Sequence, residues 1–104
     1  MGTHDGHRDR MRQRFQEFGG AGFQKHELIE MLLYNVYPRR DTNEMAHRVL
    51  DEFGGSLTKL IYSDPETISR TCSISQNAAT MFSIIGEINR RADVAFLAVR
   101  PMDE

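Results

Sequence analysis

The stretch Asp64-Pro-Glu-Thr-Ile-Ser-Arg-Thr-Cys-Ser-Ile-Ser-Gln-Asn-Ala-Ala-Thr-Met-Phe82 predicts two helices joined by a tight loop. Asp64 can cap the first helix, and Pro65 suits its first position, where the N–H has no intrahelical partner in any case. The apolar periodicity breaks before Ser75, and Ile74 is predicted to pin the loop to the core. Ser75 can cap the second helix by accepting a hydrogen bond from one of its first amides. The sequence therefore predicts a helical hairpin in the second half of the chain.

The composition predicts one small, helical, globular domain over residues 1–104. Hydrophobic residues make up 39% of the chain and charged residues 27%, which is typical of a folded protein. The single cysteine, Cys72, excludes an internal disulfide, and its place near the loop favours a buried structural thiol over a nucleophile. No stretch resembles a secretory signal or a membrane span, so we expect a cytoplasmic protein without a membrane partner.

The charge is unevenly distributed along the chain. The net charge is -2, but residues 1–40 contain seven Lys and Arg against five Asp and Glu, whereas residues 41–104 contain six against ten. The basic part is therefore the N-terminal third and not the hairpin. If the chain binds nucleic acid, residues of the first helix are expected to contribute.

Apolar residues at helical spacing predict the other elements. Gly19 and Gly20 are expected to end the first helix, and Gly54 and Gly55 the third. Asp41 or Thr42 can cap the third helix, with Glu44 as the acidic member of a capping box. Ser56 can cap a short fourth helix, and residues 94–99 can extend the last helix or form a separate arm before Pro101 ends regular structure. The predicted helices and their apolar stripes are 7–18 with Met11, Phe15 and Phe18; 24–36 with Leu28, Leu32 and Val36, widened by Ile29, Met31 and Leu33; a third to Phe53 with Ala46, Val49, Leu50 and Phe53; a short one with Leu57, Leu60 and Ile61; and one from Gln76 to about Ala92 with Ala78, Met81, Phe82, Ile85 and Ile88.

Several arginines are open to two interpretations. Arg8 and Arg12 lie one turn apart on the first helix and either pair with Asp9 and Glu17 or contact phosphate. Arg39 and Arg40 precede the predicted start of the third helix, where they either pair with neighbouring carboxylates or bind an anion together with the helix dipole. Tyr34 and Tyr37 are expected to be packing residues and not platforms for bases.

Four segments together resemble the N-terminal helical domain of the RadC family. The resemblance covers residues 6 to about 92, and its specific part is Pro38-Arg-Arg-Asp-Thr-Asn43 followed by Ala46-His-Arg48. It implies an all-α fold of five to six helices with a helix-hairpin-helix at about 56–92, and an association with DNA repair. The matching segments are Gly6-His-Arg-x-Arg-x-x-x-Arg-Phe15, His26-Glu-Leu-x-Glu-x-Leu-Leu33, Pro38–Asn43 with Ala46-His-Arg-x-Leu50, and Phe53-Gly54.

The chain departs from the family pattern at two points. The hairpin of the family reads apolar-x-Gly-Ile-Gly, whereas this chain has Ser73-Ile74-Ser75. Because serine lacks glycine's freedom at positive φ, we expect a degenerate hairpin with weakened phosphate contact. Family members also continue into a C-terminal domain that resembles the JAB/MPN metalloproteases, with a zinc site of His-x-His and Asp. No such motif occurs here, so residues 93–104 are interpreted as a tail or a stub of the linker to that domain.

The residues do not form a motif for catalysis, a cofactor or a metal. His4, His7, His26 and His47 are scattered, and His26-Glu27 lacks the second histidine of a zinc-binding His-Glu-x-x-His because position 30 is Glu30. We therefore expect a protein that is not an enzyme and that needs no cofactor and no metal.

Two hypotheses from different classes follow. In the first, the chain is a DNA-binding accessory module of weak, sequence-independent affinity, with the contact residues Arg8, Arg12, Arg39, Arg40, Ser73, Ile74, Ser75 and Gln76. In the second, it is a protein-interaction or regulatory module, docking for example on the JAB/MPN-like domain of a longer protein. The acidic balance after residue 40 and the missing glycines favour the second hypothesis, and the family resemblance favours the first.

Overall fold

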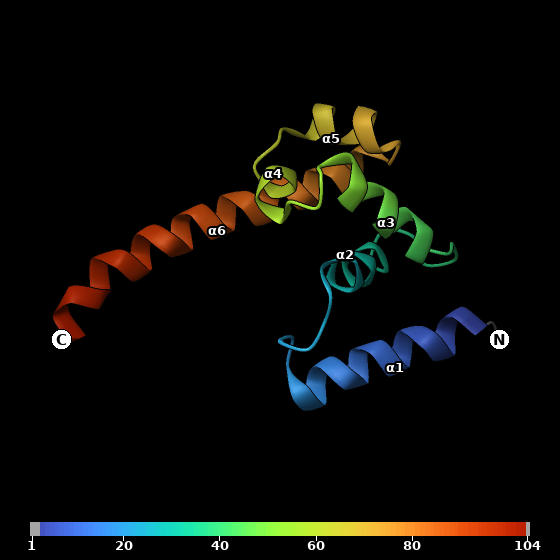
Figure 1. Cartoon of the computed structure of the whole chain (residues 1–104), viewed down its shortest axis with the longest axis horizontal. Coiled ribbons are helices and arrows are strands. Elements are labelled where there is room, and N and C mark those ends of the chain that lie inside the picture. The colour runs from blue at the N-terminus through green and yellow to red at the C-terminus, as the bar shows by residue number, and fades with distance from the viewer. Residues whose placement is uncertain (1–2, 104) are drawn as a thin grey trace. The chain divides into compact units, whose positions relative to one another are not determined.

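The computed structural model describes the backbone of residues 3–103 and the side chains of residues 6–92. Over this range the chain is all-α, with six helices and no strand, as predicted (Figure 1). It divides into two compact units, residues 1–55 and 56–104. The single domain expected from the length stays a prediction.

The first unit contains α1 (Thr3–Phe18), α2 (Lys25–Leu33) and α3 (Asn43–Glu52). Helix α2 packs against both α1 and α3. It ends three residues earlier than predicted because residues 34–36 form a turn ahead of Pro38. After α3, Gly54 and Gly55 both adopt positive φ, which glycine accepts without steric strain, and they end the helix as predicted.

The buried faces of α1 and α2 differ from the predicted stripes. Met11 is buried on α1, but Phe15 is 43% exposed and Phe18 is 75% exposed. The buried partner of Met11 on that helix is instead Arg8. On α2 the buried side chains are Ile29, Glu30 and Leu33, whereas the predicted residues Leu28, Leu32 and Val36 are only partly covered. The α1 prediction failed because Arg8 takes a core position, whereas the α2 prediction is confirmed for Ile29 and Leu33, which were expected to widen its stripe.

The start of α3 also differs in detail. Thr42 is the N-cap, but its hydroxyl donates to the carbonyl oxygen of Glu30 at 3.5 Å and accepts no hydrogen bond from α3. Asp41 accepts a hydrogen bond from the main-chain amide of Asn43 at 3.0 Å. Of the predicted stripe, Ala46 and Val49 are fully buried, while Leu50 and Phe53 are partly covered.

The second unit contains α4 (Leu57–Ile61), α5 (Pro65–Cys72) and α6 (Gln76–Asp103), and α4 and α5 both pack on α6. As predicted, Ser56 caps α4 by accepting a hydrogen bond from the amide of Lys59 at 3.1 Å. In Figure 1, α4 and α5 lie along the first part of α6. The core of this unit consists of Leu60, Ile68, Cys72, Ile74, Ala78, Ala79 and Phe82, so Cys72 is buried as predicted.

Helix α6 follows the alternative in which residues 94–99 extend it, and Ala78 and Phe82 of its predicted stripe are buried. It begins at Gln76, as expected, but continues through residues 94–99 and Pro101 to Asp103, so Pro101 does not end it. Ile88, predicted to be buried, is 60% exposed, and Gly86 takes its place at the packed face. A Cβ atom on Gly86 would lie 1.8 Å from the carbonyl oxygen of Ile61, so α4 crosses α6 where only a glycine fits.

Candidate nucleic-acid interface

The loop between α5 and α6 is held by hydrogen bonds on both sides of Ile74. The amide of Ile74 donates to the carbonyl oxygen of Ser69 at 3.2 Å, and the hydroxyl of Ser69 donates back to the carbonyl oxygen of Ile74 at 2.7 Å. The Ile74 side chain is 6% exposed and anchors the loop in the core of the second unit, as predicted. These contacts tie the loop to α5 and to the core of the second unit.

Both helices of this pair carry the predicted caps. Asp64 accepts hydrogen bonds from the amide and the hydroxyl of Thr67 at 2.8 and 3.1 Å. These bonds stabilise the carboxylate, so they lower the pKa of Asp64. Ser75 accepts a hydrogen bond from the amide of Ala78 at 3.1 Å and caps α6.

Ser73 adopts the conformation expected of glycine. Its φ of 57° and ψ of 47° place it in the left-handed region, and it is the one residue other than glycine with positive φ in the described part of the chain. Ser75 does not need that freedom, because it serves as the cap of α6. The loop thus keeps a glycine-type backbone, and Ser73, Ser75 and Gln76 are exposed on it.

Replacing Ser73 with glycine is expected to raise the free energy of unfolding by about 0.5–1 kcal/mol, because the left-handed conformation strains a residue with a Cβ atom. Thermal melting followed by circular dichroism measures this change. Ser75→Ala is the matched contrast at the other serine, and it should lower the stability by about 1 kcal/mol through loss of the cap. A lower melting temperature for Ser73→Gly would contradict this interpretation of the loop.

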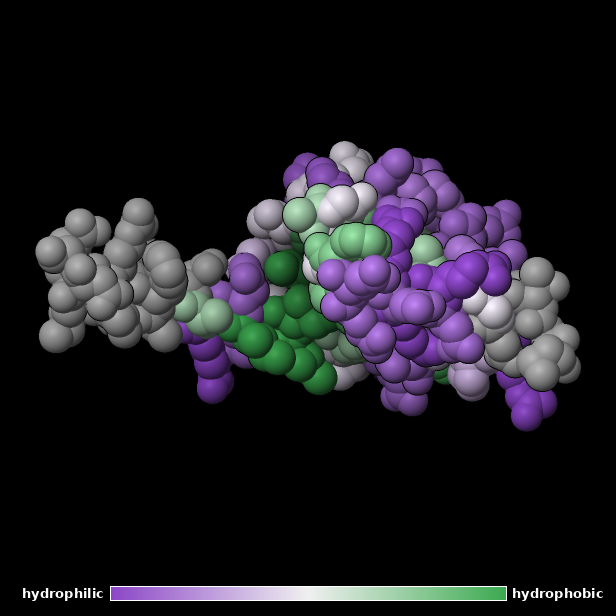
Figure 2. Space-filling model, turned by 90° about the horizontal axis from the view of Figure 1, so that it is seen from below, coloured by the Kyte–Doolittle hydropathy of each residue, from purple (hydrophilic) through white to green (hydrophobic). Residues whose placement is uncertain are grey.

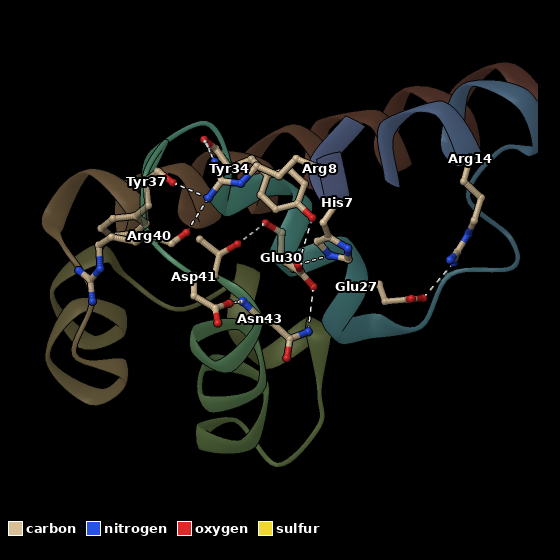
Figure 3. Close-up of polar contacts among 11 residues, drawn as sticks. His7, Arg8, Arg14, Glu27, Glu30, Tyr34, Tyr37, Arg40, Asp41 and Asn43 are labelled. Carbon is tan, nitrogen blue, oxygen red and sulfur yellow. Dashed lines mark hydrogen bonds and ion pairs between the residues drawn. The ribbon is translucent and has the colours of Figure 1, made fainter. Parts of the chain in front are cut away.

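In the first unit, Arg8 occupies the inside of the turn that follows α2. Its side chain reaches main-chain carbonyls of that turn, as the close-up in Figure 3 shows. The residue is 5% exposed, and its guanidinium carbon lies 4.5 Å from the centre of the Tyr34 ring. Its nitrogens donate to the carbonyl oxygens of Tyr34 at 3.5 Å, Tyr37 at 2.8 Å, Pro38 at 3.1 Å and Arg40 at 2.6 Å. This guanidinium is occupied inside the protein, unlike that of a surface phosphate ligand.

Arg39 and Arg40 project from the same turn and are exposed. Among the described residues neither forms an ion pair, and the guanidinium of Arg40 lies over the Tyr37 ring at 5.0 Å from its centre. The alternative interpretation had these arginines paired with neighbouring carboxylates. The structure instead leaves two cations at the surface, next to the start of α3.

Arg12 forms an ion pair with a carboxylate on its own helix, which is one of the two interpretations offered for it. Its side chain is 45% exposed and lies 3.7 Å from the carboxylate of Asp9, three residues earlier. Its guanidinium carbon also lies 5.2 Å from the centre of the Tyr34 ring. Because an exposed ion pair of this kind contributes roughly 0–1 kcal/mol, Arg12 can exchange Asp9 for a phosphate at small energetic cost.

Glu30 is the centre of a polar network that was not predicted from the sequence. Its side chain is buried; one carboxylate oxygen lies 3.0 Å from both His7 Nε2 and the Tyr34 hydroxyl, and the other 3.0 Å from Asn43 Nδ2 (Figure 3). Burial and the nearby Glu30 carboxylate raise the pKa of Tyr34, so this phenol stays a hydrogen-bond donor. The only available signal was a charged residue within an apolar helix, which normally requires a partner when it is buried.

A cavity of about 350 Å³, lined by polar and charged residues and Tyr34, opens beside this network. Its lining includes Arg10 and the start of α3 as well as the residues bonded to Glu30. A second cavity of about 380 Å³ lies between α1 and α2 and is mainly apolar, with Arg12, Phe15, Leu28, Met31, Leu32 and Asn35 around it. Among the described residues every buried polar side-chain atom has a hydrogen-bond partner.

The histidines are less scattered than the sequence suggested. His26 and His47 stack with their ring centres 4.1 Å apart and their planes at 24°. In the part of the chain with described side chains, no group of three or more His, Cys, Asp or Glu residues is arranged to hold a metal ion. None of the helices searched there is long and apolar enough to cross a membrane.

The candidate contact residues fall into two groups, one in each unit. Arg8, Arg12, Arg39 and Arg40 lie in residues 1–55, where Arg8 joins the turn that carries Arg39 and Arg40. Ser73, Ile74, Ser75 and Gln76 form the loop and helix start in residues 56–104. The first group supplies positive charge and the second supplies hydroxyls and main-chain amides.

These features define an all-α protein with a basic turn and a pair of capped helices joined by a three-residue loop. The chain is homologous to UPF0758 proteins, the family also known as RadC. It is 32% identical over 83 residues to a UPF0758 protein of Fusobacterium nucleatum, which covers 80% of this chain and 35% of the relative. It is 29% identical over 79 residues to one of Ruegeria pomeroyi, which covers 76% of this chain and 35% of the relative.

The chain thus spans about a third of the length of these curated relatives. No family model matches it. No solved structure matches it either.

Proposed function

We propose that the chain is a non-catalytic, sequence-independent DNA-binding module of a RadC-like DNA-repair protein, with its α5–loop–α6 segment as a helix-hairpin-helix. The observation that carries the proposal is the conformation of Ser73. With φ at 57°, the loop keeps the backbone that glycine would give it, although the family's glycines are absent. Serine in place of the family's glycine was the main argument against phosphate contact, but at position 73 it leaves the backbone conformation of the loop unchanged.

The start of α6 supplies donors for a phosphate. The first amides of a helix have no partner inside the helix, and the helix dipole adds partial positive charge there. Ser75 accepts from the amide of Ala78, so the amides of Gln76 and Asn77 remain for an acceptor outside the helix. The exposed hydroxyls of Ser73 and Ser75 can add hydrogen bonds that fix position without reading sequence.

The turn of the first unit supplies the charge. Arg39 and Arg40 are exposed and form no ion pair among the described residues, and Arg12 has only a weak surface partner. Binding through such contacts releases counterions from DNA, so it is expected to weaken linearly with the logarithm of salt concentration. Arg8 has no place in this contact set because its guanidinium is occupied by carbonyl oxygens.

Replacing Arg39 and Arg40 together with alanine should weaken DNA binding and reduce the slope of log K against log salt by about 2, since each phosphate contact contributes about 0.9. Fluorescence anisotropy with labelled duplex, single-stranded and branched DNA measures both quantities. The control is Arg90→Ala with Arg91→Ala, which removes the same charge from residues that pair with Glu87. Equal losses for the two double variants would show a response to net charge alone and contradict a specific contact turn.

The second candidate is a protein-interaction module, and exposed apolar residues favour it. On α6, Ile84 is 52% and Ile88 is 60% exposed, and Figure 2 shows a hydrophobic area beside the grey C-terminal segment. Ser73→Gly separates the candidates, because it keeps the left-handed backbone but removes the hydroxyl, and so should lower DNA affinity only if the loop contacts phosphate. If the chain binds no DNA even at low salt, a protein partner becomes the better proposal.

A further inference from the structure

The side chain of Arg8 connects α1 to the turn between α2 and α3 through several hydrogen bonds. Its two terminal nitrogens donate to four carbonyl oxygens, those of Tyr34, Tyr37, Pro38 and Arg40, at 2.6–3.5 Å. These acceptors span the end of α2 and the turn up to Arg40, and those of Pro38 and Arg40 lie on either side of Arg39. The guanidinium therefore fixes the backbone from which both exposed arginines project.

The turn that Arg8 contacts is an exposed segment between two helices. Residues 37–41 lie outside the helices, and the side chains of residues 38–41 are exposed. Besides those to Arg8, its contacts include the Tyr37 amide on the Leu33 carbonyl oxygen, the ring of Tyr37 beneath Arg40, and Asp41 on the amide of Asn43. A guanidinium can hold several carbonyl groups of the turn at once because its donors form a planar fork, whereas an ammonium presents three donors at one point.

Resting on the function proposed above, we propose that Arg8 is a positioning residue for DNA binding, which holds the Arg39–Arg40 turn in its binding conformation and does not itself touch DNA. A turn held in advance loses less conformational freedom when it binds, and the affinity rises accordingly. This assigns Arg8 a different role from a phosphate ligand, although both roles require a positive charge.

Lysine at position 8 distinguishes the two roles. A phosphate ligand can be lysine with little loss, because the charge remains and lysine binds phosphate as a point charge. A clamp on four carbonyl groups cannot, because lysine lacks the planar fork. We expect Arg8→Lys to raise the Kd for duplex DNA about tenfold through lost preorganisation, and to leave the salt slope within about 0.5 of the wild-type value because no phosphate contact is removed.

The experiment compares the full chain with its Arg8→Lys and Arg10→Lys variants by anisotropy over a range of salt. Arg10→Lys is the matched control, since Arg10 is exposed on the same helix and is outside the proposed contact set. It should bind as the wild type does. Hydrogen exchange of the amides of residues 39–41 provides a second readout, and these amides should exchange faster in Arg8→Lys than in Arg10→Lys.

A second variant covers the case in which Arg8→Lys does not fold. Pro38→Gly loosens the turn from its exposed side and leaves every arginine in place, so it should also raise the Kd with an unchanged salt slope. Binding by Arg8→Lys or Pro38→Gly within about twofold of the wild type would overturn the positioning role and leave the proposed function intact. Absence of DNA binding by the wild type would overturn both.

Discussion

Replacing Gly86 with alanine is expected to lower the free energy of unfolding by about 3 kcal/mol or more, because the new methyl group collides with the backbone of α4. Its Cβ atom would lie 1.8 Å from the carbonyl oxygen of Ile61 and 2.7 Å from the carbonyl carbon. Neither atom can rotate away, so α4 must separate from α6. Helix propensity alone predicts the opposite sign, since alanine is favoured over glycine by about 1 kcal/mol in a helix interior.

Thermal melting monitored by circular dichroism measures this effect, and a loss of that size corresponds to a decrease in melting temperature of about 15 °C. Gly6→Ala in α1 is the matched control, because its Cβ atom would meet only the flexible end of Arg10 at 3.2 Å. Gly6→Ala should melt at or slightly above the wild-type temperature. A melting temperature of Gly86→Ala at or above that of the wild type would contradict the close crossing of α4 and α6.

Replacing Glu30 with alanine is the second change with a large expected effect, a loss of about 2–4 kcal/mol. The carboxylate accepts hydrogen bonds from the Tyr34 hydroxyl and the Asn43 amide and lies 3.0 Å from His7 Nε2. Removing it leaves the buried phenol without its acceptor and opens a cavity between α1, α2 and α3. Because Arg8 stacks on the same Tyr34 ring, the turn that carries Arg39 and Arg40 should loosen as well.

Urea denaturation of the Glu30→Ala chain, compared with the wild type, tests this expectation. Glu17→Ala provides the control, since Glu17 is exposed on α1 and its loss should change stability by less than about 0.5 kcal/mol. If the urea midpoints of Glu30→Ala and Glu17→Ala were the same, the Glu30 network would not stabilise the first unit, and the prediction would be contradicted.

The sequence predicted the helices well where local chemistry decides. Asp64, Ser56 and Ser75 cap their helices as expected, since a cap depends on residues within three positions of it. The all-α fold and the pin at Ile74 follow from the same short-range pattern. These features need no knowledge of distant parts of the chain.

The sequence did not predict which charged residues would be buried. Arg8 meets acceptors 26–32 residues away, and Glu30 meets His7 23 residues away, so no local pattern distinguishes them from surface charges. Phe15 and Phe18 were wrongly predicted to be buried for the same reason, because Arg8 takes a core position on α1. Gly86 was missed for the same reason, since its role depends on where α4 crosses α6.

The residues of the candidate interface were proposed from the sequence, but their geometry was not predicted. Arg39 and Arg40 were identified as a cationic pair before a helix, and their exposure leaves that role available. Serine at position 73 was expected to give a degenerate hairpin because it lacks glycine's freedom at positive φ, yet the tertiary contact of Ile74 and the bonds of Ser69 hold Ser73 in the left-handed region. Packing of a neighbouring residue thus outweighed the local preference of serine.

The most direct test of the DNA-binding proposal is a nuclear magnetic resonance titration of the labelled chain with two short duplexes of unrelated sequence. The account predicts that the amide signals of Ser73, Ser75 and Gln76, together with those of Arg39 and Arg40, shift with either duplex and return as salt is added. Signals that stay unchanged in both groups at low salt would contradict the proposed function.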